Sequence, residues 1–268
     1  DLQDDGAYAG LRDALLALLD EYDIAYLKWD HNRDLTDAAH AGAPAAHGQT
    51  LATYRLLDTL RAAHPALEIE SCSSGGARVD AGILERTDRI WPSDTIDPLE
   101  RQHIQRWTSL LVPPELMGSH VGGPVAHTTG RSHRLGYRAA TALLYSFGVE
   151  WDLTSLDRSD LDALTRWVAL HKEVRPLIAE GSLVHPDHPD PAVMVTGIVG
   201  PDRTVAYYVV ATVASPATQH PAPLRLTGLD PDASYRLSEV TATTDQHSAD
   251  LAPWWAQGRG QVLTGRIL

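Results

Sequence analysis

The sequence predicts an α/β fold in which the strand–helix units of a parallel (β/α)-barrel precede a small antiparallel β-sandwich. Apolar strands and amphipathic helices alternate along residues 1–180, which is typical of a parallel sheet. Polar and charged residues follow the strands rather than precede them, as they do in (β/α)-barrels. Beyond residue 181 the helical period stops, and short β-branched runs lie between Gly, Pro, Asp and Ser clusters.

The first part of the chain contains six predicted helices. Four leucines between Leu11 and Leu19 share one face of the first helix. Asp97 followed by Pro98 is a helix start, because Asp is a good N-cap and proline suits the first helical position. The predicted helices cover residues 7–22, 49–63, 80–86, 98–112, 133–146 and 159–174.

Five predicted strands alternate with these helices and end near residues 29, 71, 92, 121 and 153. Residues 34–48 are rich in Ala, Gly, Pro and His and are expected to form a loop. In the second part, strands are predicted over residues 193–199, 204–213, 224–226, 235–237 and 262–268. We therefore expect two domains, residues 1–180 and residues 181–268.

The charge and composition of the chain argue against some classes of binding partner. The 268 residues carry a formal charge of -13, which argues against nucleic acid because phosphates would be repelled. No apolar run is long enough to cross a bilayer, and no signal peptide is recognisable, so we expect no membrane partner. The single cysteine, Cys72, rules out an internal disulfide and fits a reducing cytoplasm, where we expect the protein to reside.

Two predicted strands end in carboxylates. The first strand ends with Lys28 and Asp30, and Asp94 follows the third. Carboxylates on two strand ends of one parallel barrel can face each other across a cavity. Such a pair suits glycoside hydrolysis, in which one group is an ionised nucleophile and the other a protonated general acid. Lys28 lies on the same side of the strand as Asp30, so we expect it to lower the pKa of Asp30.

Residues near these carboxylates could bind a ligand. Trp91 offers a flat apolar face and an indole N–H to a sugar. Gly75 and Gly76 allow backbone amides to approach a ligand closely. No cofactor and no metal are expected, since the spacings of the three most suggestive histidines fit no familiar ligand motif: His120, His127 and His133.

Each of these residues also has a purely structural interpretation. Lys28 and Asp30 could form a strand-end ion pair, and Asp94 could be a turn residue before the next helix. A single tryptophan such as Trp91 is more often a core residue than a ligand-binding one. Cys72 is more often a small buried residue than a nucleophile, and no His lies in a recognisable partner pattern.

Three segments resemble motifs of the α-galactosidases of glycoside hydrolase family 36. The nucleophile motif K-W-D-x-N-R is similar to residues 28–33, and the segment E-x-C-S-x-G-G-x-R to residues 70–78. The acid/base segment W-x-S-D-x-x-D is similar to residues 91–97. Three later segments are similar to later strand ends of the family: residues 117–121, 129–131 and 147–153. The resemblance covers residues 24 to about 178 in unbroken order.

The resemblance implies a retaining hydrolase of terminal α-D-galactosyl residues, with an α-galactoside oligosaccharide as its partner. Asp30 would be the nucleophile and Asp94 the acid/base, with carboxyl groups about 5–5.5 Å apart. Two departures alter the loop that aims Asp94: Pro92 stands where the family commonly has Thr, and Thr95-Ile96 replaces Asn-Thr. The residues implied to bind galactose are Lys28, Cys72, Gly75 and Trp91.

The family's barrel has eight strands, with the nucleophile after the fourth and the acid after the sixth. The five predicted strands would then be strands four to eight of a partial (β/α)8 barrel, and the first three strands and an N-terminal sandwich domain would lie outside these residues. Because five strands cannot close a barrel, we expect residues 1–268 alone to show little activity. We expect the full-length protein to be a homo-oligomer.

Two alternative functions stay open at this point. Proteins with the same motifs transfer galactose between sugars, as enzymes of the raffinose-synthase type do, or act on α-N-acetylgalactosaminides. A substrate and acceptor panel would separate these from hydrolysis. The third possibility is a catalytically inactive carbohydrate-binding fragment, which would bind galactose without turnover.

Overall fold

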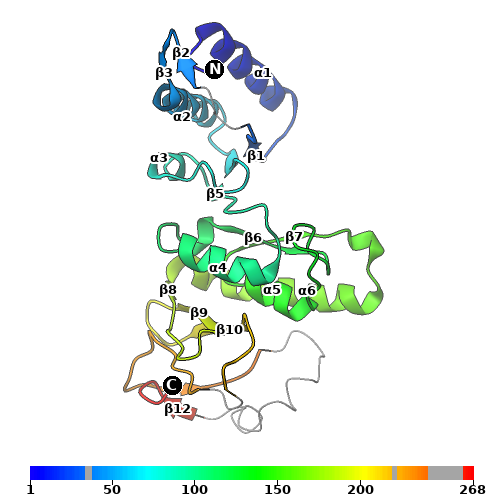
Figure 1. Ribbon diagram of the computed structural model, residues 1–268, viewed down its shortest axis with the longest axis vertical. Coiled ribbons are helices and arrows are strands. Elements are labelled where there is room, and N and C mark those ends of the chain that lie inside the picture. The colour runs from blue at the N-terminus through cyan, green and yellow to red at the C-terminus, as the bar shows by residue number, and fades with distance from the viewer. Residues whose placement is uncertain (34–37, 219–221, 241–261) are drawn as a thin grey trace. The chain divides into compact units, whose positions relative to one another are not determined.

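A computed structural model describes residues 1–33, 38–218, 222–240 and 262–268. They form two compact units, an N-terminal unit of residues 1–94 and a C-terminal unit of residues 95–268 (Figure 1). Parallel strands joined by helices occur in both units, and antiparallel strands follow in the second. The fold is therefore mixed α/β, whereas a domain boundary at residue 180 stays a prediction.

The N-terminal unit contains one three-stranded sheet in the order β1-β4-β5. Both pairs of strands are parallel, so their carboxyl ends lie at one edge of the sheet. A two-stranded hairpin, β2–β3, lies inside the predicted 34–48 loop, of which residues 34–37 are outside the described residues. The elements are α1 (Asp5–Glu21), β1 (Tyr26–Asp30), β2 (Ala39–His40), β3 (Ala43–Pro44), α2 (Ala46–Ala63), β4 (Glu68–Cys72), α3 (Ala81–Leu84) and β5 (Arg89–Ile90).

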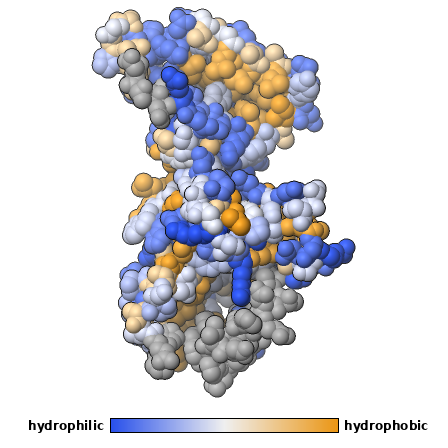
Figure 2. Space-filling view, turned by 45° about the vertical axis from the view of Figure 1, so that its right-hand side comes forward, coloured by the Kyte–Doolittle hydropathy of each residue, from blue (hydrophilic) through white to orange (hydrophobic). Residues whose placement is uncertain are grey.

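Helices cover one face of this sheet, and the other face carries the polar residues. Leu27 and Trp29 of β1 pack against the apolar core, whereas Lys28 and Asp30 alternate with them and are exposed. The buried core residues are Leu19, Leu57, Leu60, Leu67, Ile69 and Ile83. Large apolar side chains of α1 also remain exposed, among them Leu18 at 41%, and they contribute to the apolar surface of this unit in Figure 2.

The C-terminal unit contains a second parallel pair, β6 and β7, joined through α5. The elements of this part are α4 (Pro98–Thr108), η1 (Pro114–Leu116), β6 (Gly118–Gly122), α5 (Leu135–Ala142), β7 (Ser146–Glu150), η2 (Leu153–Ser155) and α6 (Arg158–Glu180). Antiparallel strands follow in two sheets, ordered β10-β9-β8 and β11-β12. They are β8 (Ser182–Val184), β9 (Val193–Val199), β10 (Ala206–Thr212), β11 (Ser234–Arg236) and β12 (Val262–Thr264).

Several predicted helix ends were wrong. The helix predicted over 98–112 ends at Thr108, because the Ser109 hydroxyl bonds the Arg106 carbonyl and competes with the helical pattern. The helix predicted over 133–146 covers only Leu135–Ala142, because Arg134 is extended. The helix predicted over 159–174 continues to Glu180 with Pro176 inside it. Val174 and Ile178 are buried on either side of this proline, so packing offsets the hydrogen bond that it cannot donate.

One predicted strand is absent, and one strand was missed. Residues 224–226 form no strand, since the preceding Pro223 has no N–H to donate to a ladder. A bond from Leu226 N to Leu268 O, at 2.6 Å, connects this segment with the last described residues. The missed strand, Ser182–Val184, pairs along the edge of β9. It is too short to show an alternation of apolar and polar residues in the sequence.

Asp97 confirms the predicted start of α4 and has additional partners. Its fully buried carboxylate accepts the Leu99 N–H at 2.9 Å, the Thr129 hydroxyl, and Arg131 Nη1 at 3.0 Å. His133 Nε2 lies 3.3 Å from the same carboxylate. Burial alone would raise the pKa of Asp97, but the hydrogen bonds from Thr129, Leu99 and Arg131 outweigh burial and hold that pKa below its usual range.

We expect Asp97→Asn to lower the free energy of unfolding at pH 7 by about 1–3 kcal/mol, because Arg131 and Thr129 would lose their buried acceptor. A carboxyl group with a depressed folded-state pKa stabilises fully above its unfolded pKa of about 3.9, and this contribution is lost as the pH falls through the folded value. The difference between the two proteins in urea unfolding should therefore shrink as the pH falls below about 4.

The matched control is Asp157→Asn, which alters an exposed N-cap that accepts the Asp160 N–H at 2.8 Å. Its loss at pH 7 should be smaller than that of Asp97→Asn. Equal losses at pH 7, or a difference from wild type that does not change on acidification, would contradict the role of the Asp97 cluster.

Candidate active site

The parallel register of β1 and β4 brings four predicted or motif residues together. Lys28 pairs with Glu70, and Asp30 pairs with Cys72, on the face of the sheet that the helices leave open. The alternation of exposed and half-buried residues along β1 confirms that Lys28 and Asp30 point to the same side.

Asp30 is an exposed carboxylate at the end of β1, next to two hydrogen-bond donors. Asn32 Nδ2 donates to Asp30 Oδ2 at 2.9 Å. This bond, then that of the Cys72 thiol, lowers the pKa of Asp30, and the charge of Lys28 adds a weaker effect in the same direction. The expectation that Lys28 lowers this pKa is therefore correct in direction, but Asn32 is the main cause.

Cys72 is buried beside Asp30. Burial raises the pKa of the thiol to about 11, so it stays protonated near neutral pH and can donate to the Asp30 carboxylate. This environment agrees with the interpretation of Cys72 as a residue other than a nucleophile.

The glycine turn after β4 packs against the segment that carries Asp94. Gly75 has φ +77°, and a Cβ there would lie 2.7 Å from Ser93 Cα and 3.0 Å from Asp94 N. A Cβ on Gly76 would lie 2.7 Å from Pro92 O. The close approach that these glycines allow is therefore to the backbone of residues 92–94, and their approach to a ligand stays a prediction.

Trp91 aims the second candidate carboxylate. Its indole Nε1 donates to Asp94 Oδ1 at 3.1 Å, and its backbone N–H donates to Ser71 O at 2.9 Å. The ring is only 3% exposed, and Lys28 Nζ lies 4.6 Å from the ring centroid. The interpretation of Trp91 as a core residue agrees with this burial, and its contact with a sugar stays a prediction. Asp94 itself is exposed, and the distance of about 5–5.5 Å to the Asp30 carboxyl group stays a prediction.

Sequence reasoning missed the partners of Lys28. The Lys28 ammonium lies 3.3 Å from Oε1 of Glu70, which is 3% exposed, and Tyr26 donates its hydroxyl proton to Glu70 Oε2. Arg89 Nη1 donates in turn to the Tyr26 hydroxyl at 3.1 Å. The available signal was Glu70 itself, a charged residue next to apolar ones in a predicted strand.

Arg78 ties the ends of β1 and β4 together. Its Nη2 atom donates to Trp29 O at 3.1 Å and to Cys72 O at 3.0 Å. His31 N also donates to Cys72 O, at 3.1 Å. Asn32 Oδ1 accepts the Ser74 N–H at 2.9 Å, so the two strand ends are joined on both sides of Asp30.

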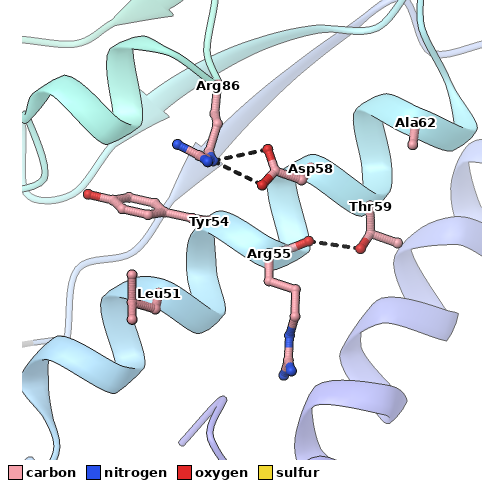
Figure 3. A pocket seen from close by; sticks show the side chains of 7 residues that line it. All are labelled: Leu51, Tyr54, Arg55, Asp58, Thr59, Ala62 and Arg86. Carbon is pink, nitrogen blue, oxygen red and sulfur yellow. Dashed lines mark hydrogen bonds and ion pairs between the residues drawn. The ribbon is translucent and has the colours of Figure 1, made fainter.

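A separate pocket lies on the outer side of α2. It has a volume of about 530 Å³ and is lined by six α2 side chains and Arg86 (Figure 3). Arg86 Nε bonds Asp58 at 3.1 Å, and its guanidinium lies 4.8 Å from the Tyr54 ring centroid. The lining includes neither candidate carboxylate, so this pocket is not the predicted site.

The described residues contain neither a membrane-spanning helix nor a metal-binding cluster. In those ranges no helix is both long and apolar enough to cross a membrane. Over the same ranges, no group of three or more His, Cys, Asp or Glu side chains could hold a metal ion. His120 instead lies 3.1 Å from Glu150, and His133 lies next to Asp97.

Known sequences resemble most of the chain. Residues 1–181 match the model of the Melibiase family, and residues 190–268 match that of the glycosyl hydrolase family 36 C-terminal domain. The Alpha-galactosidase of Escherichia coli is 44% identical over 225 residues, which are 84% of this chain and 32% of that protein. Alpha-galactosidase C of Emericella nidulans is 38% identical over 83% of this chain and 30% of its own.

Solved structures of α-galactosidases also resemble this chain. The galactosidase domain of the alpha-galactosidase-sucrose kinase AgaSK has a TM-score of 0.85 at 28% identity, over 99% of this chain and 34% of its own. The family 36 alpha-galactosidase AgaA of Geobacillus stearothermophilus, solved with raffinose, has a TM-score of 0.82 at 31% identity, over 88% of this chain and 34% of its own. The chain thus spans about a third of the length of these relatives. Because the two family models match almost all of its length, the chain belongs to the Melibiase family and carries the C-terminal domain of glycosyl hydrolase family 36.

Proposed function

We propose that this protein is a retaining α-galactosidase that cleaves terminal α-D-galactosyl residues from oligosaccharides. The observation that carries the proposal is the pair of exposed carboxylates at strand ends of one parallel sheet in the N-terminal unit. Asp30 ends β1 and Asp94 follows β5, with β4 between these two strands. Relatives named alpha-galactosidases support the reaction, and the raffinose held by one of them supports an α-galactoside as substrate.

In the first step of the proposed reaction, Asp30 attacks the anomeric carbon of galactose. A new C–O bond forms to Asp30 as the glycosidic C–O bond breaks, and Asp94 gives its proton to the departing oxygen. The hydrogen bonds from Asn32 and Cys72, which lower the pKa of Asp30, support its role as the ionised partner.

In the second step, Asp94 takes a proton from water, and this water attacks the anomeric carbon of the galactosyl-enzyme. The bond to Asp30 breaks, and galactose leaves with its original anomeric configuration. The Trp91 N–H, which holds Oδ1 of Asp94, would keep the carboxyl group in place during both proton transfers. Four residues around the two acids would bind the galactose: Lys28, Cys72, Gly75 and Trp91.

We also propose that the five parallel strands are strands four to eight of an eight-stranded barrel, and that residues 181–268 form a β-sandwich. The order of strands and helices supports this, as does the free edge of β1, which pairs only with β4 among the described residues. Relatives about three times as long, and the exposed apolar face of α1, support the view that further strands pack on this side. The missing strands would then complete the sugar pocket.

Removal of either acid should abolish most of the turnover. In the full-length protein, Asp30→Ala and Asp94→Ala should each lower kcat for an α-galactoside with a sugar leaving group by roughly 10³-fold or more. With a nitrophenyl leaving group, which departs without a proton, Asp94→Ala should lose much less of kcat/KM, whereas kcat should stay low because the second step still needs Asp94 as base. Asp13→Ala, which alters an exposed aspartate on α1, is the control and should leave kcat unchanged.

Azide separates the two roles by the configuration of its product. In Asp94→Ala, azide attacks the covalent intermediate on Asp30 and should give the α-galactosyl azide. In Asp30→Ala, azide replaces the nucleophile and should give the β-galactosyl azide. Product analysis by NMR reads the outcome, and identical products from both variants would refute the assignment of the two acids.

The acid side of the pH profile should depend on Asn32. Because Asn32 donates to Asp30 and lowers its pKa, Asp30 stays ionised to a lower pH than an ordinary aspartate. Asn32→Ala removes this bond, so the pKa of Asp30 rises and the acid limb of kcat/KM moves to higher pH. A limb that stays in place in Asn32→Ala would show that another group controls it.

A further inference from the structure

Glu70 is a buried carboxylate whose two oxygens have different partners. Oε1 lies 3.3 Å from the Lys28 ammonium, and Oε2 accepts the Tyr26 hydroxyl. Burial and the adjacent Glu70 raise the pKa of Tyr26, so the hydroxyl keeps the proton that it donates. Arg89, the neighbour of Glu70 in the sheet register, donates to the same hydroxyl. A carboxylate at this depth is costly unless it is paired, and these contacts supply the pairing.

The contacts continue from Glu70 toward the candidate acid. The Lys28 ammonium that pairs with Glu70 also lies 4.6 Å from the centroid of the Trp91 ring. The Trp91 indole donates in turn to Asp94 Oδ1 at 3.1 Å. Three successive contacts thus connect Glu70 with the group that is proposed to protonate the leaving oxygen.

We propose that Glu70 is a positioning residue: it holds the Lys28 ammonium over the Trp91 ring, where Lys28 meets a sugar hydroxyl, and away from Asp30. This inference rests on the proposed galactosidase function. An ammonium has three N–H donors, and the Lys28 side chain is 40% exposed, so donors are available to a hydroxyl beside the ion pair with Glu70.

The separation of Lys28 from Asp30 has a chemical reason. The two residues share one face of β1, and a lysine with no other anion beside it would pair with Asp30. A carboxylate in a close ion pair is a weaker nucleophile, because the cation stabilises the charge that attack must share. The charged or titratable groups that face Asp30 are Lys28 from β1, Cys72 from β4 and Arg78 from the following turn.

Glu70→Gln in the full-length protein tests this role, because the substitution keeps the shape of the side chain and removes its charge. It should lower kcat/KM by about tenfold or more. Loss of a negative charge and release of Lys28 both favour ionised Asp30, so the acid limb of kcat/KM should move to lower pH, opposite to the shift in Asn32→Ala. Glu70→Asp keeps the charge and should leave the limb in place. Glu85→Gln removes an exposed carboxylate that pairs with Arg86 and should change neither quantity.

A double-mutant cycle shows whether Glu70 acts through Lys28. In a Lys28→Met background, Glu70→Gln should have little further effect on kcat/KM, because the side chain that it positions is gone. The acid limb should then move less than in the Lys28 protein, because only the loss of the Glu70 charge still acts on it. Effects of the two substitutions that simply multiply, or a Glu70→Gln variant that loses activity equally at every pH, would overturn the inference.

A crystal structure of the Glu70→Gln protein provides a readout that needs no catalysis. The Lys28 ammonium should leave the Trp91 ring and move toward Asp30. A Lys28 side chain that stays over the ring refutes the positioning role, whatever the activity. Lack of galactoside hydrolysis by the unaltered full-length protein would instead refute the proposed function, so the two failures are distinguishable.

Discussion

The parallel pairing of β1 with β4 is the constraint on which the candidate site depends. It sets Lys28 beside Glu70 and Asp30 beside Cys72, all on the open face of the sheet. A slip of one residue in β1 would turn Lys28 and Asp30 into the apolar core and expose Leu27 and Trp29. The packing of α1 and α2 on the other face therefore fixes the chemistry of this one, although no helix residue belongs to the site.

A second constraint acts through backbone rather than side chains. The turn at Gly75 and Gly76 leaves no room for a Cβ beside residues 92–94, so the loops after β4 and β5 lie in direct contact. One departure from the family motif falls at this contact, since the carbonyl of Pro92 lies against Gly76. Proline fixes its own φ, which stiffens the segment that carries Asp94. The substitution thus changes how this loop is held and leaves the carboxylate in place.

The sequence was sufficient to predict features that depend on local pattern. The five strands that alternate with helices, the cap at Asp97 and the shared side of Lys28 and Asp30 follow from apolar periodicity and spacing. The structure contains them, with the strands parallel within each of two separate sheets. Features that depend on contacts between distant residues could not be predicted in this way. Glu70 becomes the partner of Lys28 only through the strand register, and α6 continues past Pro176 only because Val174 and Ile178 are buried.

Asn32 was missed for a different reason. It belongs to the segment 28–33 and lies two residues from Asp30, yet the sequence does not identify its amide as the main cause of the lowered pKa of Asp30. A charged neighbour such as Lys28 can be recognised from the sequence. Which way a neutral amide such as Asn32 points depends on a second hydrogen bond, which the sequence does not show. Here that bond is the Ser74 N–H, which holds Asn32 Oδ1 and turns its Nδ2 toward Asp30.

The two candidate acids differ in what surrounds them, and this difference is what a retaining mechanism requires. Asp30 lies among donors: the Asn32 amide and the Cys72 thiol both favour its charged form. Asp94 has one oxygen held by the neutral Trp91 indole, an arrangement that orients the carboxyl group while its other oxygen can carry a proton. Lys28 can interact with both acids, because it shares one side of β1 with Asp30 and its ammonium lies over the ring of Trp91, which holds Asp94. An ion pair with Asp30 would remove the difference between the two acids. The buried carboxylate of Glu70 holds Lys28 away from Asp30 and so preserves the difference between the two acids. This role explains why β4 has a glutamate at a buried position where packing alone would favour an apolar residue.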